Sequence, residues 1–296
     1  MKVTESARPH FFKCHSRLGM VNLPNGGTEL NLGVEDGPDA VLSRTFLGRF
    51  GRAKVEEFNF PLPEEIKKST YLKVMALSSK KMADLINLKL VEDETQVVVG
   101  GDHSVAFGAL MAVLQRVKAD RVGYIQFDSH GDVHLHRTSP SGNFHGMWLR
   151  PFLDEFDVPA IAEVSPDRLK PGQLMFVGNL ELEPEEETVF KDKQIEVINS
   201  ADITNDKNLA VDRMAKFTKR YEHVHISFDI DTFERGTASA TGTPAENGLA
   251  PGDVWTMLEV LRPLTQKSID LVEVNPTKPN PELTIKTARK VLLALI

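Results

Sequence analysis

Cysteine is almost absent from this chain of 296 residues, in which Cys14 is the single example. One cysteine cannot form an internal disulfide, and it offers no thiolate cluster to a zinc ion. Long hydrophobic runs are missing as well. The first residues contain no apolar core of a secretory signal, and no segment approaches the ~18 apolar residues of a membrane span. We therefore expect a cytoplasmic protein that does not enter a membrane.

A surplus of positive charge is also missing. The 35 Lys and Arg residues are outnumbered by 42 Asp and Glu residues, which leaves a formal net charge of −7. This balance excludes a strongly basic surface for nucleic acid or for an anionic membrane. With 41% hydrophobic and 26% charged residues, the composition is that of an ordinary globular protein. We expect a small molecule, and neither nucleic acid nor a membrane, as the partner.

Short apolar runs alternate with amphipathic stretches of helical length from residue 95 onward. This alternation is typical of an α/β fold, in which helices cover a parallel sheet. Apolar runs, several rich in Val and Ile, predict strands at residues 95–99, 122–127, 173–177, 194–198, 224–228 and 269–274. Helical spacing predicts helices at residues 104–118 and 251–264. Residues 22–38 and 139–143 are predicted loops, and without a linker we expect a single domain, residues 1–296.

Acidic and histidine residues cluster directly after three of these strands. The three strings are GGDHS at 100–104, DSHGD at 128–132 and DID at 229–231. Because ligands bind at the carboxyl ends of the strands of an open parallel sheet, we expect the three strings to converge on one site. A chain that stayed extended would turn Asp128, His130 and Asp132 to one side, while Ser129 and Gly131 pointed away. The same rule would place the two aspartates of DID together.

Convergence would bring together four carboxylates and two imidazoles. The residues concerned are His103, Asp128, His130, Asp132, Asp229 and Asp231. This oxygen-rich set suits divalent manganese better than metals that prefer thiolates, and buried carboxylates need cations to compensate for lost hydration. Alone, GGDHS is also consistent with a turn whose aspartate caps a helix and whose histidine is exposed, and DID with a solvated loop. Together, the three strings favour a metal site.

The same strings resemble the hallmarks of the ureohydrolase family, which are GGDHS, Asp-x-His-x-Asp and Ser-x-Asp-x-Asp. Four further strings resemble the arginase branch of that family: GVEDGP at 33–38, SGNFHGM at 141–147, TGTP at 241–244 and VEVNP at 272–276. The resemblance covers most of the chain. It implies a three-layer α/β sandwich with a central, mostly parallel sheet flanked by helices, two Mn²⁺ per subunit, and a homotrimer or homohexamer.

The resemblance also assigns roles to the metal-site residues. It implies one ion held by His103, Asp128, Asp132 and Asp229, and a second held by His130, Asp128, Asp229 and Asp231. Asp128 and Asp229 would then bridge the two ions. A metal-bridging hydroxide, oriented by Asp132, would attack the carbon of a guanidinium group and release urea.

Three more residues receive roles in the same way. The resemblance implies that Glu273 pairs with the guanidinium, that His145 gives a proton to the departing amine, and that Thr243 lines the guanidino end of the pocket. Each has a plainer alternative, namely an ion-pair partner at a strand end, a polar residue at a helix start, and a turn threonine.

The substrate depends on other positions. Ser141 and Asn143 match the arginase loop that binds the α-carboxylate of arginine, and Glu183 and Glu186 match the acidic loop that receives its α-amino group. Both glutamates are also consistent with an ordinary acidic first turn of a helix. His134 departs from the pattern, because arginases usually carry an asparagine there, and Glu183 replaces a shorter aspartate.

Three hypotheses follow. The first is an arginase that hydrolyses L-arginine to L-ornithine and urea. The second is a sister amidinohydrolase, such as an agmatinase, a guanidinobutyrase or another guanidino or formimino hydrolase, which the departures at His134 and Glu183 favour. The third is a metal-free relative that has lost catalysis, against which the intact set of metal-binding residues argues.

Overall fold

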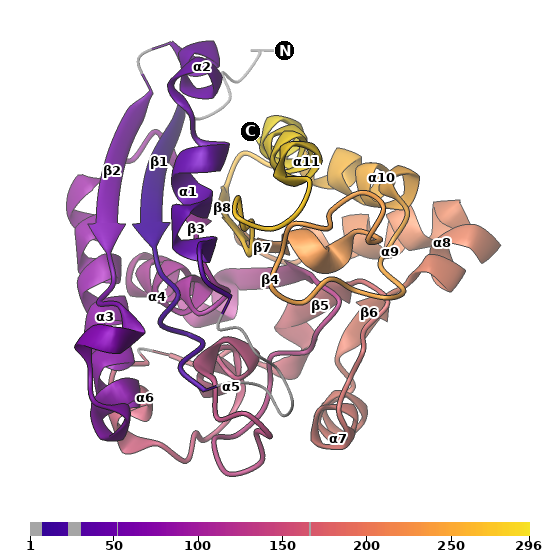
Figure 1. Ribbon diagram of the computed structural model, residues 1–296. Helices are drawn as coiled ribbons and strands as arrows, with labels where there is room; N and C mark the ends of the chain where they lie inside the picture. The colour runs from indigo at the N-terminus through magenta and orange to yellow at the C-terminus, as the bar shows by residue number, and fades with distance from the viewer. Residues whose placement is uncertain (1–7, 23–30, 52, 166) are drawn as a thin grey trace.

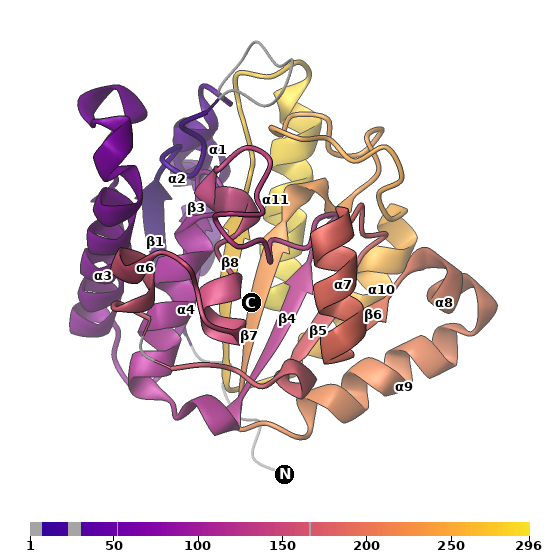
Figure 2. The same cartoon turned by 90° about the horizontal axis from the view of Figure 1, so that it is seen from below.

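Eight strands form one sheet in the computed structural model, which describes residues 8–22, 31–51, 53–165 and 167–296 (Figure 1). The strands are β1 (Arg8–His15), β2 (Lys54–Asn59), β3 (Glu94–Gly100), β4 (Val122–Phe127), β5 (Leu174–Val177), β6 (Glu196–Ile198), β7 (His223–Asp229) and β8 (Lys267–Val272). Their order in the sheet is β2-β1-β3-β8-β7-β4-β5-β6, and every described pair is parallel. Figure 1 shows β2 beside β1, and Figure 2 shows the sheet from β1 to β6 from below. The α/β prediction is confirmed.

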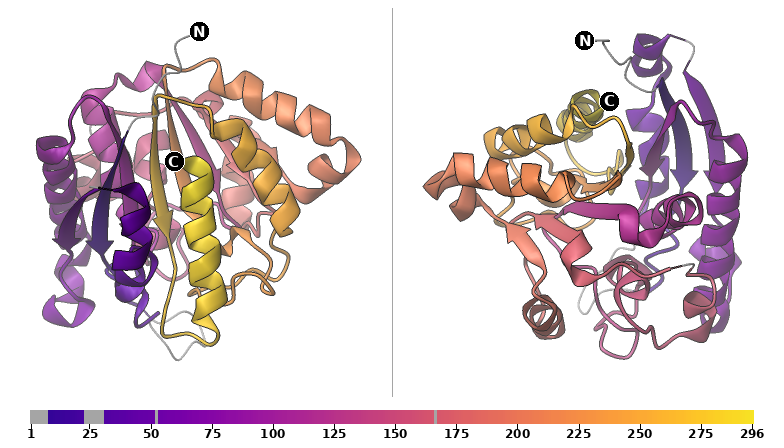
Figure 3. Two further views of the ribbon diagram at one scale, coloured as in Figure 1. Left: turned by 90° about the horizontal axis from the view of Figure 1, so that it is seen from above. Right: turned by 180° about the vertical axis from the view of Figure 1, so that it is seen from behind.

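Helices cover both faces of this sheet and complete the three layers (Figure 3). One face packs against α3 (Tyr71–Lys89), α4 (Val105–Arg116), α5 (Arg150–Leu153), α6 (Pro159–Ala162) and α7 (Pro184–Lys193). The other face packs against α1 (Gly37–Val41), α2 (Arg44–Leu47), α8 (Ser200–Asn205), α9 (Lys207–Thr218), α10 (Pro251–Leu261) and α11 (Pro281–Leu295). Within the described ranges, no helix is long and apolar enough to cross a membrane.

The strands are buried on both faces, as neighbouring side chains show. Phe11 packs into the core under α9, α10 and α11, whereas Phe12 packs into the core under α3 and α4. Val97 packs into the same core as Phe11 and Val98 into the same core as Phe12, because successive side chains of a strand point to opposite faces. Double burial explains why strands such as β3 and β4 are nearly continuous apolar runs in the sequence.

The predicted elements differ from the structure mainly near the N-terminus. All six predicted strands and both predicted helices are present, with ends displaced by a few residues. Strands β1 and β2 were not predicted. Residues 23–30 of the predicted loop at 22–38 lie outside the described residues, and residues 34–41 form a 3-10 helix and α1. The loop prediction was therefore wrong for that last part.

Candidate active site

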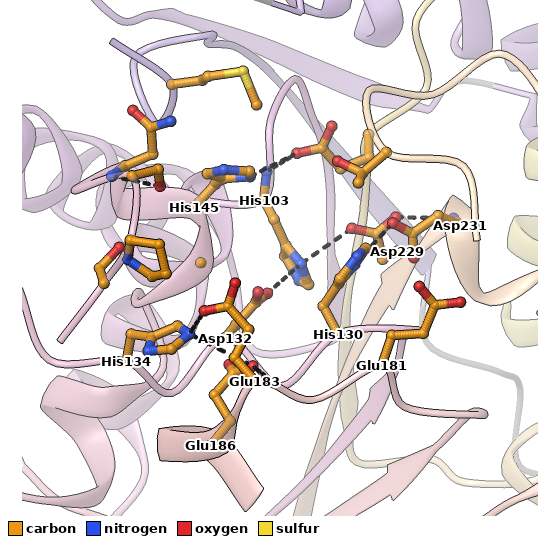
Figure 4. A pocket seen from close by; sticks show the side chains of 18 residues that line it. His103, His130, Asp132, His134, His145, Glu181, Glu183, Glu186, Asp229 and Asp231 are labelled. Carbon is orange, nitrogen blue, oxygen red and sulfur yellow. Dashed lines mark hydrogen bonds and ion pairs between the residues drawn. The ribbon is translucent and has the colours of Figure 1, made fainter. Parts of the chain in front are cut away.

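The three strings meet at the carboxyl edge of four adjacent strands, β3, β8, β7 and β4. DSHGD follows β4, whereas GGDHS begins at the last residue of β3 and DID at the last residue of β7. Glu273 directly follows β8 and joins them. Side chains from all four segments line a cavity of about 430 Å³ (Figure 4). The predicted convergence of the strings is confirmed.

The expected alternation of side chains along an extended chain within DSHGD and DID was wrong, however. β4 ends at Phe127, and Asp132 has a left-handed backbone with a φ of 55°, so the segment is not extended. The backbone N–H of Ser129 donates to a carboxylate oxygen of Asp231 at 3.3 Å, and its hydroxyl donates to the backbone carbonyl of Asp231 at 2.9 Å. Asp231 itself lies in a 3-10 helix, Ile230–Thr232. Tight turns, and not strand alternation, therefore aim these side chains at one another.

His103 lies at the centre of the first group of candidate ligands. Its Nδ1 is 2.8 Å from Oδ2 of Asp132, and 3.2 Å from Oδ2 of both Asp128 and Asp229. The side chain is almost fully buried, which excludes the alternative of an exposed histidine. The other part of that alternative, an aspartate that caps the following helix, agrees with the structure: Oδ1 of Asp102 accepts the backbone N–H of Ser104 at the start of α4.

His130 forms the second group with Asp231 and Asp128. Its Nδ1 is 3.1 Å from Oδ2 of Asp231 and 3.5 Å from Oδ1 of Asp128. In each of the two trios, His103 with Asp128 and Asp132, and His130 with Asp128 and Asp231, the candidate ligand atoms lie within 4.8 Å of one another. Asp128 belongs to both trios through different oxygen atoms, which is the arrangement that a bridging ligand requires.

The carboxylates carry more negative charge than the two histidines can balance. Burial raises the pKa of Asp229 well above its usual value, and the charges of Asp231 and Asp128 add to this effect. The pKa of Asp231 is raised to about 6, again chiefly by burial. Burial would lower the pKa of His103, but Asp132, Asp128 and Asp229 raise it well above its ordinary value. These residues fit divalent cations, because such ions supply the missing positive charge.

Two supporting residues were missed by the sequence analysis. Nε2 of Gln126 donates to Oδ2 of Asp128 at 2.6 Å, and Nε1 of Trp148 donates to Oδ2 of Asp132 at 3.0 Å. Both hydrogen bonds orient carboxylates of the candidate metal site. Gln126 was detectable in the sequence, since it is an amide side chain within the apolar and aromatic run of strand β4, whereas nothing in the sequence marked Trp148.

Glu273 and His145 lie on the other side of His103. Oε1 of Glu273 accepts the backbone N–H of His103 at 2.9 Å, and Oε2 accepts from Nδ2 of Asn31 at 2.8 Å. Burial, with a contribution from Asp102, raises the pKa of Glu273 to about 8. Nδ1 of His145 is 4.0 Å from Oε1 of Glu273, and burial lowers the pKa of His145. Glu273 therefore faces the cavity without a Lys or Arg partner in the described ranges.

The far end of the cavity contains the predicted substrate-binding residues. Nε2 of His134 is 2.7 Å from Oε2 of Glu183 and 3.6 Å from Oε2 of Glu186, as Figure 4 shows. Glu186 accepts the backbone N–H of Glu183 at the start of α7, as expected of a glutamate in the first turn of a helix. Its side chain is buried, however, and not exposed to solvent as an ordinary first-turn glutamate would be. Burial, then the charge of Asp132, raises the pKa of Glu186 to about 7.

Three further predicted residues, Ser141, Asn143 and Thr243, also line this cavity. The side-chain amide of Asn143 is bonded to the backbone of the loop at Val21 and Asn22, where Oδ1 accepts two N–H groups and Nδ2 donates to a carbonyl. This amide therefore anchors the cavity wall, and one N–H of its Nδ2 has no acceptor in the part of the chain that the structure describes. Oγ of Ser141 accepts the backbone N–H of Asn143 and keeps its own hydrogen to donate.

A sequence model of the Arginase family matches residues 17–296. The chain belongs to the arginase family. The arginase of Bacillus caldovelox is 32% identical over 211 residues, which cover 69% of this chain and 69% of that protein. Family membership and the buried Asp and His groups agree on a hydrolase that acts on guanidino compounds.

Solved structures agree with this family fold. The arginase of Entamoeba histolytica, in complex with L-ornithine, matches with a TM-score of 0.83 at 24% identity and covers 98% of each chain. The agmatine ureohydrolase of Thermoplasma volcanium matches with a TM-score of 0.68 at 18% identity, covering 98% of this chain and 89% of the other. Because proteins with different substrates in their names share the fold, the arginase-family fold does not by itself identify the substrate.

Proposed function

We propose that this protein is a binuclear manganese enzyme that hydrolyses L-arginine to L-ornithine and urea. The observation that carries the proposal is Asp128, which is fully buried and contributes one oxygen to each of two His and Asp trios at the base of a cavity. An oxygen-rich site of this kind suits Mn²⁺. By family resemblance, we also propose a homotrimer or homohexamer. The single cysteine supports our proposal of a cytoplasmic location.

Three residues of the cavity have separate roles in the proposed reaction. When bound, a pair of divalent ions lowers the pKa of water so that a hydroxide nucleophile is available near neutral pH. Asp132 accepts a hydrogen bond from the nucleophile and orients it. Glu273 accepts two parallel N–H bonds from the guanidinium and holds its carbon in place. His145, whose pKa burial lowers, takes up the proton that the water loses on becoming hydroxide and gives it to the departing amine nitrogen.

The far end of the cavity supports arginine as the substrate. Among the described residues, the hydroxyl hydrogen of Ser141 and one amide hydrogen of Asn143 have no acceptor, and both are suitable donors for an α-carboxylate. Glu183 and Glu186 provide carboxylates for an α-ammonium group. The similar arginase from Entamoeba histolytica binds L-ornithine, the product expected here. Thr243 lines the same cavity and is assigned to the guanidino end.

A second candidate function is the hydrolysis of a guanidino compound without the α-amino acid group, such as agmatine or guanidinobutyrate. The contact of His134 with both Glu183 and Glu186 favours it, because these carboxylates already have a partner. An ammonium group of the substrate must compete with the imidazole for them.

The test is urea release by Mn²⁺-loaded protein from arginine, agmatine and guanidinobutyrate measured side by side, together with metal content and oligomeric mass. The proposal predicts the highest kcat/KM for arginine and two ions per subunit. A higher kcat/KM for agmatine or guanidinobutyrate would be consistent with the binuclear centre but would contradict arginine as the preferred substrate. Absence of urea from all three, with the metal bound, would contradict both functions.

A further inference from the structure

A column of polar side chains runs through the core behind the candidate metal site. Along β7, His223, His225 and Ser227 alternate with Val224, Ile226 and Phe228, whose side chains pack under α9, α10 and α11. Along β8, Ser268 and Asp270 alternate with apolar residues in the same way. The register pairs Ser227 with Asp270 and His225 with Ser268, so these polar residues are cross-strand neighbours on the face that α4 covers.

The column is continuous with His103. Nε2 of His103 is 3.0 Å from Oγ of Ser227, and that hydroxyl donates to Oδ1 of Asp270 at 2.6 Å. Oδ2 of Asp270 is 2.8 Å from Nε2 of His225, and neither of these two atoms has a further partner within the part of the chain that the structure describes. Nδ1 of His225 is 2.7 Å from Oγ of Ser268, which also contacts His223 at 2.9 Å.

The directions of the hydrogen bonds near His103 follow from counting hydrogens. A hydroxyl has one hydrogen, and Ser227 gives it to the carboxylate of Asp270. The contact between Ser227 and His103 therefore has Oγ as acceptor, and Nε2 of His103 must carry the hydrogen. In a neutral imidazole the other nitrogen then has a lone pair. That nitrogen, Nδ1, is the atom that faces Asp128, Asp132 and Asp229.

Asp270 is a carboxylate at the centre of the sheet with no exposed surface. Removing a carboxylate from water is unfavourable unless a partner compensates it, and replacing such a group by an apolar one is often neutral or stabilising. Stability of the sheet therefore does not require an acid at this position. Its hydrogen bond to Ser227, and through Ser227 to His103, gives the acid a role at the metal site.

We propose that Ser227 and Asp270 are positioning residues that fix His103 in the tautomer and ring orientation needed to bind the first of the two metal ions. The proposal rests on the binuclear centre of the proposed function. Asp270 acts through Ser227 to increase the basicity of Nδ1, as carboxylates behind metal-binding histidines do elsewhere. The second ion, at His130, is connected to this column through the shared carboxylate of Asp128, so we expect its binding to change less than that of the first ion.

The test compares two variants that each lose one buried hydroxyl. Ser227→Ala removes the link between His103 and Asp270, whereas Ser268→Ala removes a fully buried hydroxyl from the same column on the far side of His225. Metal-free wild type and both variants are titrated with Mn²⁺ by calorimetry, and their thermal unfolding is measured without metal. Substitution by Co²⁺ provides an absorption spectrum that reports the ligands of each ion.

We expect Ser227→Ala to weaken binding of one ion by about 10- to 100-fold and to leave the second ion in place. Ser268→Ala should change the affinity for either ion by less than about twofold, although it loses a comparable amount of thermal stability. An unchanged affinity in Ser227→Ala, or an equal loss in both variants, would overturn the proposal. If Ser227→Ala does not fold, Asp270→Asn, which retains the side-chain volume, undergoes the same titration with the same expectation.

The outcome for wild type separates this proposal from the proposed function. Wild-type protein that binds no divalent ion contradicts the binuclear centre itself. Wild-type protein that binds two ions, with both variants equal to it, contradicts only the role of Ser227 and Asp270.

Discussion

His134 and Glu183 are in contact, with Nε2 of the imidazole 2.7 Å from Oε2 of the carboxylate. These are the two positions at which the sequence departs from the arginase pattern. The longer glutamate reaches the histidine, so the two departures form one unit at the far end of the cavity. His134 is almost fully buried and Glu183 about half exposed, which places the carboxylate where a substrate can still reach it.

The first prediction concerns His134→Asn. Removing the imidazole frees Glu183 and Glu186 for the α-ammonium group of arginine, so we expect KM for arginine to fall by a few-fold to about tenfold with kcat unchanged. Steady-state kinetics with arginine and agmatine measures this. Glu183→Gln is the matched control, because it leaves His134 in place, removes the charge that it contacts, and should raise KM for arginine. A lower kcat in His134→Asn at constant KM would contradict the idea of competition.

The second prediction concerns Asp128, which contributes to both trios. Asp128→Ala should lose both ions, since one carboxylate serves two sites. Asp231→Ala should lose the ion at His130 and retain the other. Metal analysis after dialysis against trace Mn²⁺ distinguishes the two results. Retention of two ions by the Asp128 variant would refute its bridging position.

The third prediction concerns His145, which faces Glu273 and is not one of the candidate metal ligands. His145→Ala should retain two ions and lose about 10²- to 10⁴-fold in kcat, the usual contribution of a general acid or base. Metal analysis and kinetics on the same preparation check both parts. Loss of metal from this variant would show a structural role.

The fourth prediction concerns pH and His223. Burial, with contributions from His225 and Arg116, lowers the pKa of His223 from 6.5 to about 3. Between these values the unfolded chain binds a proton that the folded chain does not, so stability falls as pH decreases from 6.5 toward 3. His223→Gln should flatten this dependence by up to about 1.4 kcal/mol per pH unit. Urea unfolding of metal-free wild type and variant at pH 7.0 and 5.0 gives the difference, and parallel profiles would contradict it.

The sequence predicted the location of the site because that depends on few properties of the chain. Buried parallel strands are visible as apolar runs, and their carboxyl ends meet at one edge whatever the details of the loops. Strand β2 was not visible, because Lys54–Asn59 is half exposed and contains two adjacent glutamates in place of an apolar run. Strand β1 is interrupted by Lys13 and a histidine at each end of its buried part.

The geometry within the site could not be predicted, because it depends on contacts between distant residues. Asp132 and Glu273 both adopt left-handed backbones, with φ values of 55° and 65°, which are uncommon for residues other than glycine. Glu273 is held by the backbone of His103 and by Asn31, and Asp132 by Trp148. Such partners come from other segments and leave no pattern in the neighbouring sequence.

The strand order determines when this site forms. β7 and β8 occupy the middle of the sheet, between β3 and β4, although they come last in the chain. During synthesis, the strands that precede β7 are therefore present as two groups that do not pair, and their inner edges stay open until the final strands emerge. His103 and Asp128 come together only after β7 and β8 insert, so capture of metal is a late event in folding, and the nascent chain depends on protection of these edges until then.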